Sequence, residues 1–201
     1  FIGLDVESEH FLSYFAQVHY NTYDKGYFPS KGSDFKAAYS LYTDNMAQYN
    51  EQAPFSALSA SWASVIPATR RFSIIPIYGR VLIGKGIPYP LKNAIGGEVY
   101  GFYIPQQLPF AGVTNMELME NSIIITSLKF RQRMGSIHYL TLTGNYGLTD
   151  SHFFEILKGK QLFGISAGYG MDSVFGPLEI SLGYSNQTDK GSCFVNLGYY
   201  F

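Results

Sequence analysis

The stretch Cys193-Phe194-Val195-Asn196-Leu197-Gly198-Tyr199-Tyr200-Phe201 closes the sequence and decides the fold prediction. Every second residue, counted back from Phe201, is apolar or aromatic, and the alternate row is mixed. Because alternate side chains of a strand point to opposite faces, the pattern predicts a strand with one continuous apolar face. In water such an edge strand invites aggregation, whereas a closed membrane barrel has no free edge and turns that face to lipid.

The same period of two recurs along the chain and is the primary signal for β-structure. Turn-forming clusters separate the alternating segments. Pro76 interrupts one of them and predicts a bend or bulge there. We therefore expect an all-β, antiparallel transmembrane β-barrel with about ten strands, forming a single domain over residues 1–201. The apolar rows that should face outward include those of residues 12–20, 35–41, 58–66, 124–130, 140–146 and 178–184.

Composition supports a barrel wall and excludes several other classes. Charged residues make up 14% of the chain, against about 25% in a typical soluble domain. The polar rows consist mostly of Ser, Thr, Gly, Asn and Gln, which suits a hydrated interior better than an open surface. No run of 18 apolar residues predicts a transmembrane helix. With a net charge of −1 and no basic stripe, nucleic acid is not an expected partner. A soluble β-sandwich or ligand-binding barrel remains an alternative.

Several motifs, taken in order, resemble those of a known family. The sequence is similar to the bacterial surface-antigen barrels, which are the C-terminal barrels of outer-membrane assembly and translocation proteins. The closing strand ends in Phe201, as theirs does. The motifs that carry the resemblance are Phe28-Pro29-Ser30-Lys31-Gly32, Ile95-Gly96-Gly97, Tyr100-Gly101-Phe102-Tyr103, Pro109-Phe110-Ala111-Gly112 and Gly176-Pro177-Leu178-Glu179-Ile180-Ser181-Leu182-Gly183-Tyr184.

This resemblance implies a location and a set of partners. The location is the bacterial outer membrane, and the partners are the lipid bilayer, the barrel-insertion machinery and a second copy of the chain in a homodimer. Tyr199 and Phe201 would carry the insertion signal. Family barrels have sixteen strands, so about ten would be the C-terminal part, and we expect the chain to be a piece of a longer protein.

The lumen loop at Tyr100, Gly101 and Phe102 departs from the family, whose loop carries an arginine before the glycine. Tyrosine cannot make the bidentate contact of a guanidinium with a carboxylate, which argues against an assembly or secretion activity. The neighbouring residues 103–110 resemble the variant fused to patatin-like phospholipases. We therefore expect a non-enzymatic anchor whose parent is a patatin-like lipid hydrolase with its catalytic domain outside this sequence. The alternative is a translocating or assembly barrel that moves polypeptide or lipid across the membrane.

No residue of this chain is expected to be catalytic. Gly164-Ile165-Ser166-Ala167-Gly168 matches the G-x-S-x-G elbow of serine hydrolases, but an elbow needs a tight turn followed by a helix. Here the alternation continues through the motif, so Ser166 should lie mid-strand and face the lumen. The four histidines form no pair with metal-ligand spacing, and we expect neither a metal nor a cofactor. A basic row at Lys129, Arg131 and Arg133 could line a pore, hold lipid headgroups or form an ion pair across the lumen.

Overall fold

The computed structural model describes residues 12–198 except for 46–47, 49–52, 69–70, 75–76, 84–86, 99–103, 105 and 115. The described part consists almost entirely of β-strands. Its elements are β1 (Leu12–Asn21), β2 (Gly32–Thr43), β3 (Phe55–Ala68), β4 (Arg71–Ile74), β5 (Ile77–Ile83), η1 (Tyr89–Leu91), β6 (Asn93–Ile95), β7 (Gln107–Leu108), β8 (Leu118–Glu120), β9 (Ser122–Met134), β10 (His138–Asp150), η2 (Phe153–Lys158), β11 (Lys160–Ser173), β12 (Gly176–Ser185) and β13 (Gly191–Leu197).

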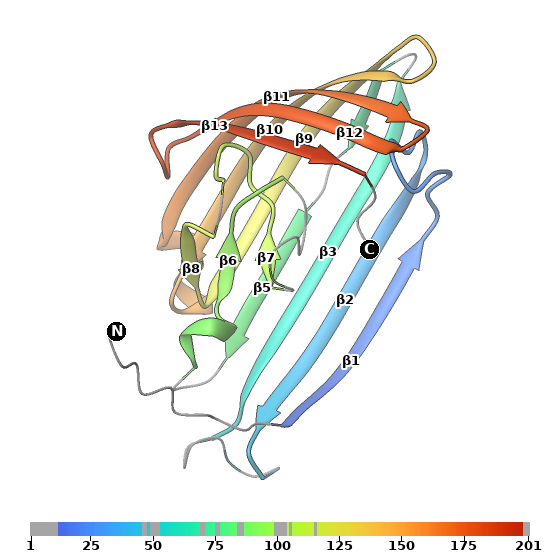
Figure 1. The fold of residues 1–201 in the computed structure, drawn as a ribbon. Helices are drawn as coiled ribbons and strands as arrows, with labels where there is room; N and C mark the ends of the chain where they lie inside the picture. Colours follow the sequence, from blue (N-terminus) through green and yellow to red (C-terminus); the bar gives the residue numbers. More distant parts are fainter. Residues whose placement is uncertain are drawn as a thin grey trace, which may run out of the picture.

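Ten of the strands form one antiparallel sheet in the order β1-β2-β3-β4-β9-β10-β11-β12-β13, with β5 also between β3 and β9. Figure 1 shows how this sheet curves, so that β10 to β13 arch over the space beside β1, β2 and β3. Within the described residues, β1 and β13 each pair with one neighbour only. The predicted all-β antiparallel fold of about ten strands is therefore confirmed, with two edges unpaired in the described part of the sheet.

The segments β4 and β5 follow one another along the same line of the sheet, between β3 and β9. Ile74 and Ile77 are three residues apart, and so are their partners on β3, Val65 and Trp62. The register with β9 is equally continuous. The register with both neighbours is therefore the same before and after residues 75–76, where a bend or bulge was predicted at Pro76. Pro76 itself lies outside the described residues.

The two faces of the sheet have the predicted polarity. On β10, Leu142 is 47% exposed whereas its neighbour Thr143 is only 5% exposed. Alternation of this kind runs from β3 to β13 and places a row of large apolar side chains on the convex face. This row includes Leu58, Trp62, Leu128, Phe130, Leu140, Leu142, Ile165, Leu182 and Val195. Cys193 is exposed on the same face. The convex surface is thus apolar and the concave surface largely polar.

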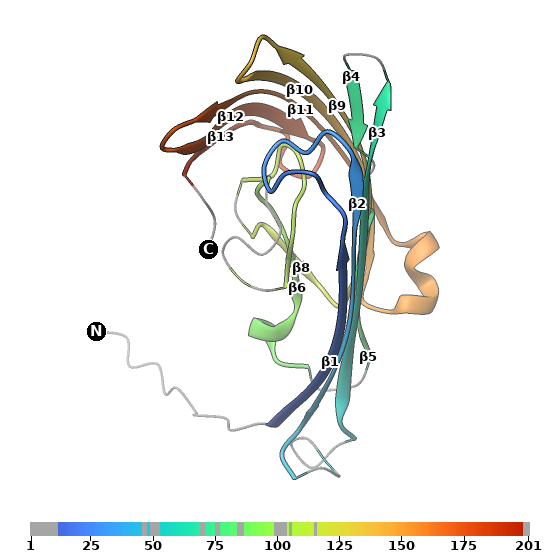
Figure 2. The same cartoon turned by 90° about the vertical axis from the view of Figure 1, so that its right-hand side faces the viewer.

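A smaller sheet lies inside the concavity. β6 pairs in parallel with β7 and antiparallel with β8, and Figure 2 shows β6 and β8 on the concave side of the large sheet. They pack against β9 and β11 through a core that the sequence pattern did not predict. Its members are Ile95, Leu108, Phe110, Val113, Ile123, Ile125 and Leu162. One region of the interior is therefore dry, although the inner rows were predicted to be polar.

Candidate functional site

The described residues of segment 93–118, which we call the inward loop, lie on the concave side of the sheet. Its base is fixed by Asn93, which is completely buried. The Asn93 side-chain amide donates to the carbonyl oxygens of Arg80 (2.9 Å) and Asn121 (2.7 Å), and its oxygen accepts from Arg80 Nη1. Since a buried amide must find its partners within the protein, this residue ties the loop to β5 and to the start of β9.

The tip of the inward loop rests on glycines of the wall. A Cβ atom added to Gly164 of β11 would lie 2.2 Å from the Ala111 carbonyl oxygen and 2.7 Å from Phe110 Cε1. The Ala111 N–H donates to Asn145 Oδ1 of β10 at 3.1 Å. Gly112 has a φ of +82°, and a Cβ atom there would meet the backbone of β12 at 2.2 Å. Glycine is required both in the loop and in the wall because their backbones approach each other closely here.

The connection between β1 and β2, residues 22–31, enters the interior from the opposite end of the sheet. Asp24 holds it in shape by accepting hydrogen bonds from the Ser30 hydroxyl and from the backbone N–H groups of Ser30 (2.8 Å) and Lys31 (3.3 Å). These bonds, led by the Ser30 hydroxyl, lower the pKa of the Asp24 carboxyl to about 2. Tyr23 donates to the Ala63 carbonyl at 3.2 Å, and burial raises its pKa to about 12.

Phe28, in this connection, points into the barrel interior although its φ is +47°. Its ring stacks on Tyr139 of β10 with centroids 4.3 Å apart and planes 8° from parallel. On β9, the Arg131 guanidinium lies 5.2 Å from the centre of the Phe28 ring. A Cβ atom on Gly170 would come within 2.7 Å of the ring. The site therefore stacks an aromatic pair beside a cation, an arrangement that stabilises a desolvated guanidinium.

Arg131 also lines a small cavity of about 50 Å³, together with three other charged side chains. Arg131 is 7% exposed, and its Nε and Nη1 atoms have no hydrogen-bond partner. The charged and hydroxyl side chains of the lining include Glu98 of the inward loop and Lys129, Arg131, Thr141, Thr143, Ser166 and Glu179 of the wall. This group of charges around a buried arginine is the strongest candidate for a functional feature in the described chain.

The three residues of the predicted basic row do not share one environment in the structure. Lys129 and Arg131 face the cavity, whereas Arg133 lies at the end of β9 and donates to the Ser136 carbonyl at 2.6 Å. Within the described residues, no carboxylate lies within 4 Å of Lys129 or Arg131. An ion pair across the lumen, one of the three interpretations of this row, is therefore not in direct contact.

The G-x-S-x-G motif lies inside β11, where Ser166 pairs with Thr143 of β10 and Gly183 of β12. Ser166 is 4% exposed and lines the charged cavity. The strand continues to Ser173, so neither a tight turn nor a helix follows the serine. The geometry does not provide a nucleophile elbow.

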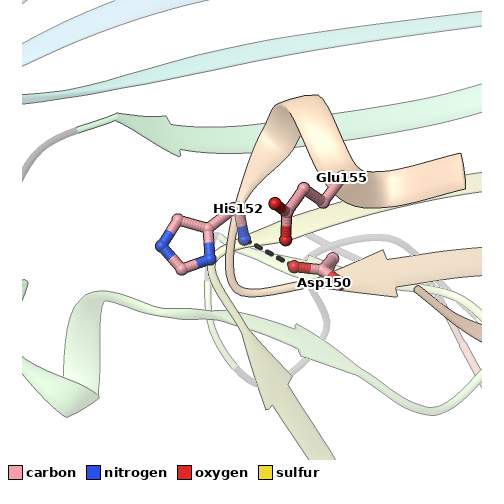
Figure 3. Close-up of side chains that lie close together, drawn as sticks. All are labelled: Asp150, His152 and Glu155. Carbon is pink, nitrogen blue, oxygen red and sulfur yellow. Dashed lines mark hydrogen bonds between the residues drawn. The ribbon is translucent and has the colours of Figure 1, made fainter. Parts of the chain in front are cut away.

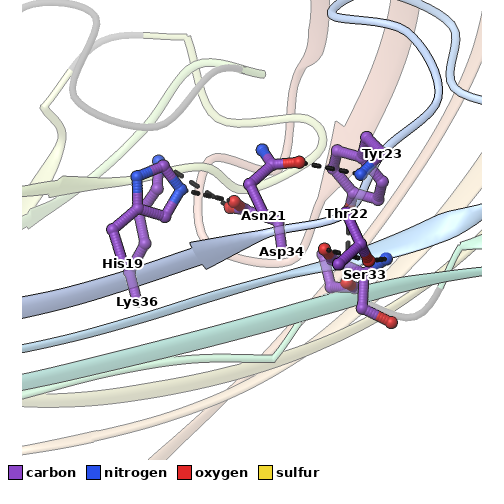
Figure 4. Close-up of polar contacts among 8 residues, drawn as sticks. His19, Asn21, Thr22, Tyr23, Ser33, Asp34 and Lys36 are labelled. Atoms are coloured by element: carbon purple, nitrogen blue, oxygen red, sulfur yellow. Dashed lines mark hydrogen bonds and ion pairs between the residues drawn. The ribbon is translucent and has the colours of Figure 1, made fainter.

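Two further groups of polar side chains lie elsewhere in the described chain. At the β1 edge (Figure 4), Asp34 accepts from His19 Nε2 at 2.6 Å and lies 3.8 Å from Lys36 Nζ. This pair of strands lines a larger open groove that also contains Arg80 and Gln106. The contacts are side chains of neighbouring strands and hold β1 against β2.

Asp150, His152 and Glu155 form the second group, at the β10–η2 connection (Figure 3). Their ligand-type atoms lie within 4.8 Å of one another. Asp150 Oδ1 accepts from the His152 backbone N–H at 2.7 Å and from the Ser151 hydroxyl at 3.5 Å. His152 and Glu155 are exposed, and these hydrogen bonds account for the group as an ordinary turn before a helix. These three residues were not predicted to lie together.

The site residues predicted from the family resemblance cannot be placed. Tyr100, Gly101 and Phe102 of the lumen loop and Tyr199 and Phe201 of the insertion signal all lie outside the described residues. Sequence reasoning quoted Phe28 and Phe110 only as parts of motifs and missed their roles. A usable signal was present, because the inner row of β11 contains Gly164, Gly168 and Gly170. Glycines on one face of a strand indicate that something approaches that face closely.

Comparison with known proteins places the chain in a family. A family model described as the OMP85 superfamily matches residues 3–201. No curated protein matches the chain. Among the described residues, no helix is long and apolar enough to cross a membrane.

Proposed function

The chain belongs to the OMP85 superfamily, and from this premise we propose that it is the outer-membrane anchor of a larger bacterial protein. Family membership supports an outer-membrane β-barrel of the assembly and translocation type. Our proposal is narrower, because it assigns this barrel an anchoring role and no catalytic role. The observation that carries it is an apolar convex face over an interior that the inward loop and the β1–β2 connection partly occupy.

Anchoring follows from burial of that convex face. Outward leucine, isoleucine, valine and aromatic side chains would meet acyl chains, with about 25 cal/mol gained per Å² of apolar surface removed from water. The hydrogen-bonded ladders satisfy the backbone groups of the paired strands, as hydrocarbon requires. A soluble β-sandwich would leave this same row facing water, which makes that alternative the weakest.

The two unpaired edges support a longer wall. β1 offers ten residues of open edge and β13 offers seven, and open edges are unfavourable in a bilayer. We infer that further strands of the parent protein complete a barrel of sixteen strands between them. A homodimer is a second way of covering the edges. Truncation of the parent just before Phe1 distinguishes the longer wall from the homodimer. Only the homodimer would keep the edges of the truncated chain covered.

A patatin-like lipid hydrolase remains the proposed parent. The proposal rests on the resemblance of residues 103–110 to the barrels fused to such enzymes and on Tyr100 in place of the family's loop arginine. The residues that precede Phe1 test it directly. A hydrolase domain there with its own serine elbow would support the proposal, and tandem domains without any nucleophile motif would contradict it.

The membrane orientation of the wall can be tested by placing a charge on the convex face. Leu142→Lys should destabilise the folded protein in lipid vesicles by about 2–4 kcal/mol if the position lies near mid-bilayer. Leu142→Met keeps an apolar side chain of similar volume and is the matched control. Equilibrium unfolding in vesicles measures both. Equal stability and equal insertion of the two variants would refute the outward assignment.

The second candidate function is a translocating barrel, and membership in a superfamily of assembly and translocation proteins favours it. The two candidates differ in the state of the lumen. An anchor should show little ion conductance in planar bilayers, whereas a translocating barrel should open when cargo or voltage displaces the inward loop. Conductance of the complete protein, measured with and without residues 93–118, distinguishes them.

A further inference from the structure

The connection between β10 and β11 contains the short 3-10 helix η2 (Phe153–Lys158). Figure 2 shows this light-orange helix on the convex side of the large sheet, away from β6 and β8. The helix contacts β5, β9 and β10. Its buried residue is Ile156, which is 5% exposed. η2 therefore lies against the outer surface of the wall, at the end where β10 stops and β11 begins.

The six side chains of η2 form three rows. Because a 3-10 helix has three residues per turn, side chains three residues apart lie directly above one another. The row that contains Ile156 is the one turned to the wall. Phe154 and Leu157 form a second row and are 97% and 80% exposed. Glu155 and Lys158 form the third row and are also exposed. The helix thus has one row on the wall, one exposed apolar row and one exposed charged row.

The exposed apolar row is continuous with further apolar surface. The Phe154 ring meets the ring of Phe153 edge-on, with centroids 5.5 Å apart and planes at 64°. Contiguous exposed apolar side chains of this kind mark interaction surfaces. A helix with an apolar row beside a charged row is typical of segments that lie in the headgroup region of a bilayer. Aromatic side chains are also enriched at that depth.

The size of the row favours a bilayer over a protein as its partner. A stable protein–protein interface buries about 800 Å² on each partner, spread over about 20–30 residues. The exposed row of η2 consists of two large side chains, Phe154 and Leu157. A bilayer requires no minimum contact area, because each apolar side chain that leaves water contributes on its own. The convex face beside η2 is already the surface that we assign to lipid.

We propose that η2 docks on the headgroup region of the bilayer, with Phe154 and Leu157 inserted among the acyl chains and the charged row turned to the headgroups and water. This inference rests on the proposed function, because it needs the convex face to meet lipid. Docking would fix the depth of the wall. β10 and β11 contain 13 and 14 residues, more than the 9–11 or so that cross a bilayer, so strand length alone leaves the depth open.

A photo-crosslinking amino acid placed in η2 of the complete protein tests the docking. We expect p-benzoylphenylalanine in place of Phe154, or of Leu157, to form covalent adducts with phosphatidylcholine in vesicles under ultraviolet light. The matched control has the same amino acid in place of Glu155, on the charged row of the same helix, where the adduct yield should be several-fold lower. Mass spectrometry of the protein measures the yield. The replaced side chains are all exposed, and gel mobility verifies the folded form.

The same amino acid in place of Leu142, on the convex face of β10, separates this inference from the proposed function. Lipid adducts at Leu142 without adducts at Phe154 and Leu157 would retain the outward wall and overturn the docking of η2. No lipid adduct at any of the three positions would contradict the anchor role as well. Adducts of η2 with a second copy of the chain or with another part of the parent protein would overturn the docking. Equal lipid yields at Phe154 and Glu155 would do the same, because the two rows would then meet one environment.

Discussion

The contact between the inward loop and the wall depends on the absence of one methyl group at Gly164. An alanine Cβ there would lie 2.2 Å from the Ala111 carbonyl oxygen, and ordinary contact begins at 3.4 Å. The loop tip would have to retreat by about 1.2 Å, which is the difference between these distances. Retreat would also stretch the hydrogen bond from Ala111 N–H to Asn145. We predict that Gly164→Ala destabilises the protein by about 1–3 kcal/mol, as overpacking usually does.

The neighbouring strand provides a matched control. Gly144 of β10 pairs directly with Ile165, the residue after Gly164, but it faces outward and a Cβ atom there would meet nothing within 4 Å. Because alanine has less backbone freedom to lose than glycine, Gly144→Ala should be neutral or stabilising by about 0.5–1 kcal/mol. The two changes are chemically identical, so the predicted difference of about 1.5–4 kcal/mol isolates the loop contact.

The assay is equilibrium unfolding in lipid vesicles, followed by the gel mobility of the folded form, with protease sensitivity of the inward loop measured in parallel. Gly164→Ala should unfold at lower denaturant and expose the loop to protease, whereas Gly144→Ala should do neither. If both variants matched the wild type in stability and in loop protection, the loop tip would not rest on β11.

Three further predictions concern the β1–β2 connection and β11. Phe28→Ala removes a buried ring stacked on Tyr139 and should cost about 3–5 kcal/mol; unfolding in vesicles measures it, and unchanged stability would contradict the stacking. The Asp24 carboxyl has its pKa lowered from 3.8 to about 2. The ionised carboxylate therefore stabilises the folded protein fully above pH 3.8, and this contribution is lost as the pH falls through about 2. An NMR titration with half-protonation near 3.8 would disprove the hydrogen bonds from Ser30. Ser166→Ala should leave any lipase activity of the parent unchanged, and loss of activity with an intact fold would show that β11 contributes to catalysis.

The faces of the wall were predictable because strand periodicity is local. Alternation along residues 178–184 and 193–197 assigned Leu182 and Val195 to the same face before any pairing was known, and the structure exposes both on the convex side. A two-residue period requires only that one face meets a different environment from the other. The fold class and the mid-strand position of Ser166 followed from the same rule.

The filling of the interior was not predictable in this way. β6, β7 and β8 contain only two or three residues each, too few to display a period. Their positions depend on non-local partners, such as Asn93 bonded to Asn121 and Gly112 seated on β12. Ile123 and Ile125 share the inner row of β9 with Lys129 and Arg131, so the polarity of one strand changes along its length according to which part of the loop covers it.

Arg131 also links the two segments that fill the barrel. The β1–β2 connection enters from the end of the sheet where β9 turns into β10, and the inward loop enters from the end where β9 begins. Phe28 covers one side of the guanidinium and the cavity containing Glu98 lies beside it. Displacing the β1–β2 connection would remove the ring beside the guanidinium, and displacing the inward loop would open the cavity that the guanidinium lines. Because both depend on one residue, their displacements are energetically coupled.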